Sequence, residues 1–272
     1  GDGIDQNCDG VDGTDADGDG HPSEASGGQD CDDTDASIGP TSDADGDGIL
    51  DCADPASSGI YYGDLEIDND MMAAYFCQGF ESIWGDLVLH VNELSSNSSS
   101  DLDCLQMVSG DMTVYGDGGS EFTFESLTYA GSLNMESPGT VYIPLLESVP
   151  GSFSVYGHST LYLDLPVLEY AGEIDINYAA SIEMPMLTGI DDESMIHIQA
   201  TEADLLDLQS LVEAYDLYLW LGSEAVVDLS SLASAHFIDL EGGEVVDFSS
   251  LETVNDRINL NPGIVELDGD IV

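Results

Sequence analysis

One short pattern recurs through most of the chain at an interval close to 21 residues. Each copy opens with small or polar residues and continues with an apolar residue, any residue and a second apolar residue, as in residues 63–67. The first apolar positions of the ten copies are 20 to 25 residues apart: Leu65, Leu87, Met112, Leu133, Phe153, Ile174, Ile196, Leu217, Ile238 and Ile258. Such a period is typical of a solenoid, in which each repeat forms one coil and buries its apolar face against its neighbours.

Within each copy the apolar positions alternate with other residues, as they do in a strand with one buried face. A second apolar stretch follows in most coils, for example at residues 141–146, 161–165 and 226–229. Two or three short strands per coil make a β-helix. We therefore predict an all-β solenoid of about ten coils of ~21 residues over residues 59–272, which at ~4.8 Å per coil is a rod roughly 50 Å long.

The chain is extremely acidic: it has 56 Asp and Glu residues and a single basic side chain, Arg257, so its formal net charge is -55. Salt or bound cations must relieve this self-repulsion. The lack of Lys and Arg argues against nucleic acid and anionic membranes as partners, since both are bound largely through basic side chains. The chain also has no apolar run long enough to predict insertion into a membrane.

Five cysteines lie in the first 104 residues, and none forms a CxxC pair, so zinc is poorly supported. Cys77 and Cys104 flank one repeat, and a bridge between them would link the first coils. The odd count leaves at least one thiol free or paired with another chain. The connectivity of Cys8, Cys31, Cys52, Cys77 and Cys104 cannot be read from their spacing and stays open at this stage.

Residues 1–58 are dense in Asp and Gly and carry too few large apolar side chains for a hydrophobic core. Residues 43–54 match a twelve-residue calcium loop, with carboxylates at positions 1, 3, 5, 9 and 12, glycine at position 6 and a backbone carbonyl at position 7. The predicted ligands of this loop are Asp43, Asp45, Asp47, Ile49, Asp51 and Asp54.

Two further runs have the same oxygen spacing. Asp15, Asp17 and Asp19 open a second loop, whose later ligands would come from Asp30, Asp32, Asp33 or Asp35. A third loop would use Asp5, Asn7, Asp9 and Asp12. The alternative is a solvated, disordered acidic tail. Three phased loops, each with glycine at the sixth position, favour several Ca²⁺ ions, and Mg²⁺ suits such flexible loops less well.

Residues 2–40 resemble the metal-binding motif of secreted bacterial surface proteins, and residues 43–54 are similar to a thrombospondin type 3 calcium repeat. Residues 80–87 and 105–112 resemble the receptor L domain, a right-handed β-helix related to leucine-rich repeats. These resemblances imply calcium binding, a right-handed solenoid, and a surface module that is structural or binds protein or peptide partners.

We therefore expect an extracellular or cell-surface, non-enzymatic structural protein that calcium rigidifies and that self-associates head to tail into a fibre or surface layer. The alternative is a recognition or adhesion module that binds a glycan or a surface protein. Its binding face would be the outward row Glu66, Val88, Thr113, Asn134, Ser154, Asp175, His197, Tyr218, Asp239 and Asn259.

A polysaccharide-active enzyme ranks third, and we assign no catalytic residues. A lyase usually needs a basic residue to take the proton, and the chain offers only Arg257. Among 56 acidic residues, some pair reaches the separation that a glycoside hydrolase needs by chance. The five histidines, His21, His90, His158, His197 and His236, are scattered.

We predict that residues 95–100 form an exposed loop, in which Asn97 begins a sequence for N-glycosylation.

Overall fold

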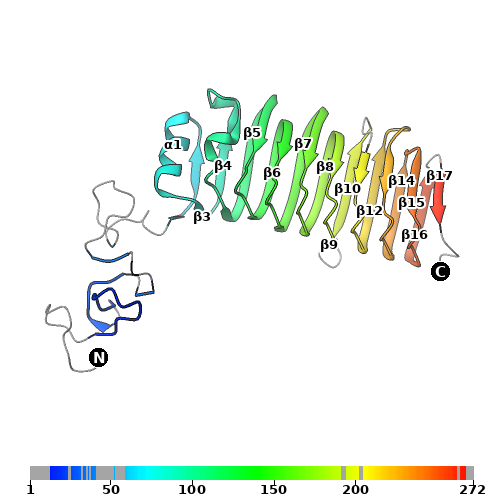
Figure 1. The fold of residues 1–272 in the computed structure, drawn as a ribbon. Helices are drawn as coiled ribbons and strands as arrows, with labels where there is room; N and C mark the ends of the chain where they lie inside the picture. Colours follow the sequence, from blue (N-terminus) through cyan, green and yellow to red (C-terminus); the bar gives the residue numbers. More distant parts are fainter. Residues whose placement is uncertain are drawn as a thin grey trace.

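The computed structural model describes residues 13–23, 26–31, 33–34, 36, 38–40, 52, 59–190, 194–201, 205–261 and 264–267, with the side chains of 158–160 and 264–267 left out. From Gly59 onward the described chain winds into an elongated rod of stacked parallel strands (Figure 1). The elements are β1 (Ile60–Tyr62), β2 (Leu65–Ile67), α1 (Asp70–Gly79), β3 (Ser82–Trp84), β4 (Leu87–His90), η3 (Val91–Glu93), η4 (Ser99–Leu102), β5 (Met107–Thr123), β6 (Tyr129–Tyr142), β7 (Ser148–Asp164), β8 (Tyr170–Glu183), β9 (Gly189–Ile190), β10 (Met195–Ala200), β11 (Leu205–Asp207), β12 (Glu213–Leu221), β13 (Val226–Asp228), β14 (Ser234–Glu241), β15 (Val245–Phe248), β16 (Thr253–Asn261) and β17 (Ile264–Leu267).

The ten apolar positions predicted from the repeat lie directly above one another in a single ladder. Each pairs in parallel register with its equivalent in the next coil, from Leu65 opposite Leu87 through to Ile238 opposite Ile258. We call the sheet built on this ladder face A. The prediction of one coil per repeat is confirmed, and the rod makes about nine turns.

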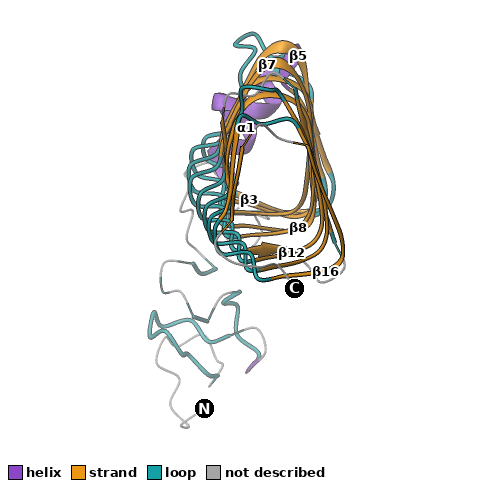
Figure 2. Cartoon of the chain, turned by 90° about the vertical axis from the view of Figure 1, so that its right-hand side faces the viewer, coloured by secondary structure: helices purple, strands orange, loops and turns teal. Residues whose placement is uncertain are grey.

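Two further ladders complete each coil. Face B passes through β1, β3, the starts of β5 to β8, β9, and the starts of β12, β14 and β16. Face C passes through the ends of β5 to β8 and through β11, β13, β15 and β17. Seen along the rod, the coils nearly superpose around one interior, and the turns stack along one side (Figure 2).

Inward side chains from all three faces fill this interior. Phe153 on face A and Phe122 and Leu163 on face C are almost wholly buried, as are their equivalents in other coils. The alternation is plain in β10, where Ile196 and Ile198 are buried and His197 between them is not. These apolar side chains therefore form the packed core, and burial of apolar surface at roughly 25 cal/mol per Å² stabilises the stack.

Glycine marks the corner between face B and face A in the first six coils. The residues are Gly63, Gly85, Gly110, Gly131, Gly151 and Gly172. A Cβ added to Gly85 would lie 2.1 Å from the carbonyl oxygen of Gly63, so the backbones of successive coils pass too close there for any side chain. The later coils carry Ser194, Tyr215 and His236 at this corner, which must therefore be built differently.

The amino-terminal end of the rod contains a helix that the repeat did not predict. α1 and the 3₁₀ segments η3 and η4 replace the face C strand in the first two coils. Asn69 caps α1 by accepting a hydrogen bond from the backbone nitrogen of Met72 at 3.0 Å, and the helix buries Ala73 and Phe76. Among the described residues, no helix is long and apolar enough to cross a membrane.

The described residues contain two disulfides. Cys77 and Cys104, with Cα atoms 5.6 Å apart, join α1 to the chain that follows η4, which selects the bridge across the first coils from the pairings that the sequence left open. Cys31 is joined to Cys52, a pairing that the sequence left open. Cys8 lies outside the described residues.

The serine-rich segment 95–100 is only partly the exposed loop that we predicted, since Ser95, Ser96 and Ser100 are exposed and the others are not. Ser98 and Ser99 are buried, and the Ser99 hydroxyl both donates to the Thr123 carbonyl and accepts from the Thr123 nitrogen, each at 2.7 Å. The side chain of Asn97 accepts a hydrogen bond from the Ser120 hydroxyl at 2.7 Å. The segment therefore packs into the second coil because its hydroxyls pair with the backbone of the next coil.

Candidate functional site

Three predicted calcium ligands converge in the Asp-rich segment. Asp15, Asp17 and Asp19 bring carboxylate oxygens within 4.8 Å of one another. The loop closes because the backbone nitrogens of Gly18 and Gly20 donate to the two oxygens of Asp15 at 2.7 and 3.1 Å. Both glycines have positive φ, 81° and 98°, which side chains rarely tolerate.

The Asp17 carboxylate is the group in this loop that most needs a bound cation. Its Oδ2 is buried and has no hydrogen-bond partner, while Oδ1 accepts from the backbone nitrogen of Asp19 at 3.1 Å. Burial raises the pKa of this carboxyl group, and the neighbouring charges of Asp19, Asp15 and Asp33 raise it further. A carboxylate oxygen without a donor, among like charges, is costly unless a cation binds it.

Asp33 also reaches this loop. Its Oδ1 accepts a hydrogen bond from the backbone nitrogen of Ala16 at 2.8 Å, which brings a residue predicted as a later ligand back to the loop. Hard carboxylate oxygens on a flexible glycine loop are the ligands that Ca²⁺ prefers. The residues therefore fit a calcium ion.

Asp30 does not join this cluster. It is 1% exposed and lies beside Cys31 and Cys52. Those cysteines are oxidised to a disulfide, so neither offers the thiolate that binds a metal. The remaining predicted ligands lie outside the described residues: Asp5, Asn7, Asp9, Asp12, Asp32, Asp35, Asp43, Asp45, Asp47, Ile49, Asp51 and Asp54.

On the solenoid, three histidines are held by carboxylates of the preceding coil. The ring nitrogens lie 3.1 Å from the carboxylate oxygen in the His90–Glu66 pair, 2.7 Å in His197–Asp175 and 2.9 Å in His236–Asp216. The two residues of each pair lie about one coil apart in the sequence, and the stacking of one coil on the next brings them into contact.

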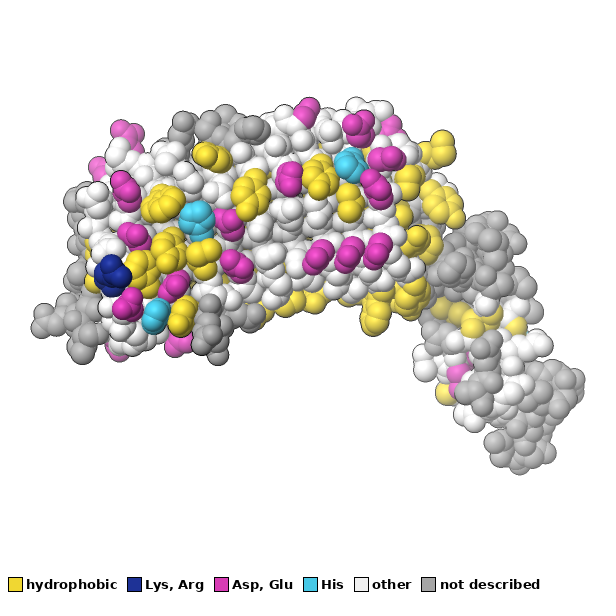
Figure 3. Space-filling view, turned by 180° about the vertical axis from the view of Figure 1, so that it is seen from behind, with side chains coloured by type: hydrophobic (Ala, Val, Ile, Leu, Met, Phe, Trp, Pro, Cys, Tyr) yellow, Lys and Arg dark blue, Asp and Glu magenta, His cyan; other side chains and the backbone are white. Residues whose placement is uncertain are grey.

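Asp175 lies in the outward row that we predicted as a binding face. It also accepts a hydrogen bond from the Tyr156 hydroxyl at 2.8 Å, and this bond raises the pKa of Tyr156. Acidic, hydrophobic and histidine side chains are interspersed on the side of the rod that Figure 3 shows.

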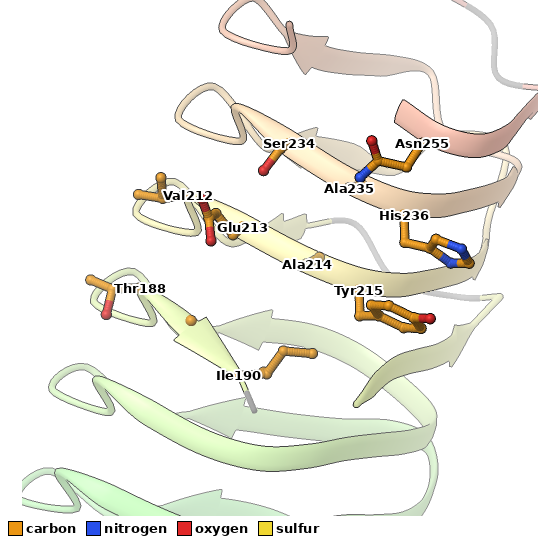
Figure 4. A pocket seen from close by; sticks show the side chains of 11 residues that line it. Thr188, Ile190, Val212, Glu213, Ala214, Tyr215, Ser234, Ala235, His236 and Asn255 are labelled. Atoms are coloured by element: carbon orange, nitrogen blue, oxygen red, sulfur yellow. The ribbon is translucent and has the colours of Figure 1, made fainter. Parts of the chain in front are cut away.

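An open groove of about 660 Å³ lies farther along the rod, on face B (Figure 4). One side carries Val212, Glu213 and Ser234, and the other carries Tyr215 and His236. The groove is also lined by Thr188, Gly189, Ile190, Ala214, Ala235 and Asn255. The sequence analysis missed Tyr215 and Asn255. The sequence signal for this region is that glycine no longer occupies the corner between face B and face A in the coils after Gly172.

The fold and these sites define a disulfide-containing parallel β-solenoid that follows an Asp-rich segment with a candidate metal loop. No protein-family model, curated protein or solved structure matches the chain. The resemblances to calcium repeats and to the receptor L domain therefore rest on their motif residues alone.

Proposed function

We propose that this chain is an extracellular, non-enzymatic structural protein whose amino-terminal segment is ordered by calcium and whose solenoid forms a rod. The observation that carries the proposal is the convergence of Asp15, Asp17 and Asp19 around a buried carboxylate oxygen without a hydrogen-bond partner. The net charge of -55 adds a general demand for cations.

The disulfides support the location. Cys31–Cys52 and Cys77–Cys104 would be maintained in an oxidising compartment, whereas cytosolic thiols are normally kept reduced. Secretion or display at a cell surface is therefore part of the proposal.

Self-association is also part of the proposal, and the amino-terminal end of the rod supports it. An apolar groove of about 360 Å³ opens there beside α1, and Met71 and Tyr75, which line it, are 80% and 67% exposed. Tyr62 and Trp84 add exposed aromatic surface on the neighbouring strands β1 and β3. Contiguous apolar surface on a highly charged protein marks an interaction site, and stacking of rods end to end would cover it.

Calorimetric titration with Ca²⁺ tests the metal site. The wild-type chain should bind calcium, and Asp17→Asn should weaken the site at least about tenfold because one charged ligand is lost. Asp239→Asn, which removes one carboxylate from face A of the solenoid, is the matched control and should leave the affinity unchanged. Equal binding by Asp17→Asn and wild type would contradict the assignment.

Limited proteolysis adds a structural readout. A chelator should expose residues 13–40 to cleavage and leave the strands of the solenoid protected. Protection of this segment that is the same with and without chelator would refute a calcium-dependent role. Sedimentation velocity with and without calcium would show whether rods associate.

Recognition of a ligand is the second candidate function. The observation that favours it is the face B groove, which does not depend on calcium.

A further inference from the structure

The face B groove begins where the glycine corner ends. In the second to sixth coils the glycine corner before face A has no space for a side chain, and at Gly172 an added Cβ would lie 2.3 Å from the carbonyl oxygen of Pro150. Two and three coils later, Tyr215 and His236 occupy this corner. The solenoid therefore changes from a closed corner to one that carries large side chains, and the groove lies beside this change.

The corner side chains form a fixed aromatic wall. The rings of Tyr215 and His236 stack with centroids 4.3 Å apart and planes 8° from parallel. Asp216 Oδ1 lies 2.9 Å from Nδ1 of His236, which fixes the imidazole and leaves Nε2 as the ring nitrogen for a ligand. Because stacking and a carboxylate already hold this wall in place, binding of a ligand costs little free energy for ordering its side chains.

The opposite side is polar and open. Glu213 is exposed and Ser234 half-buried, and they occupy equivalent positions in successive coils, with Glu213 opposite Ser234 in the β12–β14 register. Thr188 lies on this side of the groove one coil earlier, and the side chains follow the rod axis from coil to coil (Figure 4). The polar oxygens of Glu213 and Ser234 thus lie one coil apart, at the ~4.8 Å spacing of parallel strands. In the coil before them the Thr188 hydroxyl donates to the carbonyl oxygen of Glu169 at 3.2 Å.

The lining selects one chemical class of ligand. Polar and apolar groups contribute in similar measure, which suits a ring with an apolar face and hydroxyl edges better than a lipid tail. The surrounding charge disfavours anionic polymers, because Glu213 and Asp216 belong to a chain of net charge -55. An extended sugar chain also advances by close to one coil spacing per ring.

We propose that this groove binds a neutral, linear polysaccharide that lies along the rod axis. Apolar sugar-ring faces pack against Ile190 and against the edges of the Tyr215 and His236 rings, whose faces stack on each other, and hydroxyl groups bond to Glu213 and Ser234. This recognition goes beyond the structural function proposed above and does not rest on it, because the groove is built wholly from the solenoid.

Calorimetry of the full chain with soluble hexasaccharides tests the inference. The probes are β-1,4-linked glucose, N-acetylglucosamine and mannose hexamers, with a hexamer of galacturonate as the anionic comparison and a Lys-rich peptide as the cationic one. At least one neutral hexamer should bind, and the galacturonate hexamer should not. Tyr215→Ala should weaken binding about tenfold, because it removes the stacked wall, and Tyr215→Phe should retain most of the affinity.

Tyr162→Ala is the matched control. Tyr162 is a tyrosine on face C, 59% exposed and outside the groove, so its loss should leave binding unchanged. Circular dichroism and a thermal transition verify that each variant is folded. If Tyr215→Ala is not folded, His236→Gln, expected to weaken binding by disturbing the stack, takes its place.

Four results would overturn the inference: no binding of any neutral hexamer, tighter binding of the galacturonate hexamer, binding of the Lys-rich peptide alone, or equal losses in the Tyr215 and Tyr162 variants. Binding should persist in chelator. Failure of glycan binding while calcium still orders residues 13–40 would leave the calcium proposal standing, and the reverse result would leave the glycan site standing.

Discussion

Replacing Cys77 and Cys104 together by alanine should loosen the amino-terminal end of the rod while the distant coils keep their protection. The bridge closes a sequence separation of 27 residues and ties α1 to the chain after η4. Chain-entropy arguments give about 3.5 kcal/mol at 25 °C for a loop of this length. Opening of this region should therefore become roughly 400-fold more frequent in the variant.

Hydrogen exchange measured by mass spectrometry resolves this effect along the chain. Peptides that cover α1 and η4 should exchange faster in the double variant, and peptides from β12 and β14 serve as an internal reference. Each coil contacts mainly its neighbours, so the effect should fade within a few coils.

A double alanine variant of Cys31 and Cys52 provides the control, since that disulfide lies in the Asp-rich segment. It should leave the exchange of α1 unchanged. Unaltered protection of α1 without the Cys77–Cys104 bridge would refute the reasoning, as would an equal loss of protection along the whole rod.

Two further changes probe the packing and the pH dependence. Leu133→Ala removes a fully buried side chain from the middle of the face A ladder and should cost about 2–5 kcal/mol in urea denaturation, whereas the outward Ser154→Ala should stay within about 0.5 kcal/mol. Hydrogen bonds from the Ser95 hydroxyl and backbone nitrogen lower the pKa of Asp70, so this contribution to stability is present above the ordinary aspartate pKa and is lost as the pH falls through the lowered value. Ser95→Ala should thus lower the thermal midpoint near neutral pH, with a difference that shrinks in acid; a difference that grew in acid would contradict this account.

The repeat pattern alone was sufficient to predict the solenoid. Strand residues alternate between two faces, so an apolar pair recurring every coil has to point into one interior. Leu65, Met112 and their equivalents therefore fall into register without further information. The spacing of Asp15, Asp17 and Asp19 was also sufficient to predict that their carboxylates come together, because alternate residues of a tight glycine loop can point inward.

The helix α1 was missed although its signals were present. Asn69 is a strong N-cap residue, and Asp70 follows it in the first turn. The repeat pattern predicted an all-β solenoid and assigned no helix to residues 70–79, which fall where the later coils carry a face C strand. In the structure the helix packs Phe76 into the core of the first coils.

The tertiary structure alone decided which side chains meet across coils. Coil lengths vary between 20 and 25 residues, so the neighbour of a given residue in the next coil depends on where each turn takes up the difference. The contacts of Asp175 with Tyr156 and His197, and the stacking of Tyr215 on His236, follow from that register and from the change of corner after Gly172. The sequence thus determined the coil and its core, because local alternation and burial suffice for both, whereas the surface sites required the three-dimensional stacking of residues about one coil apart.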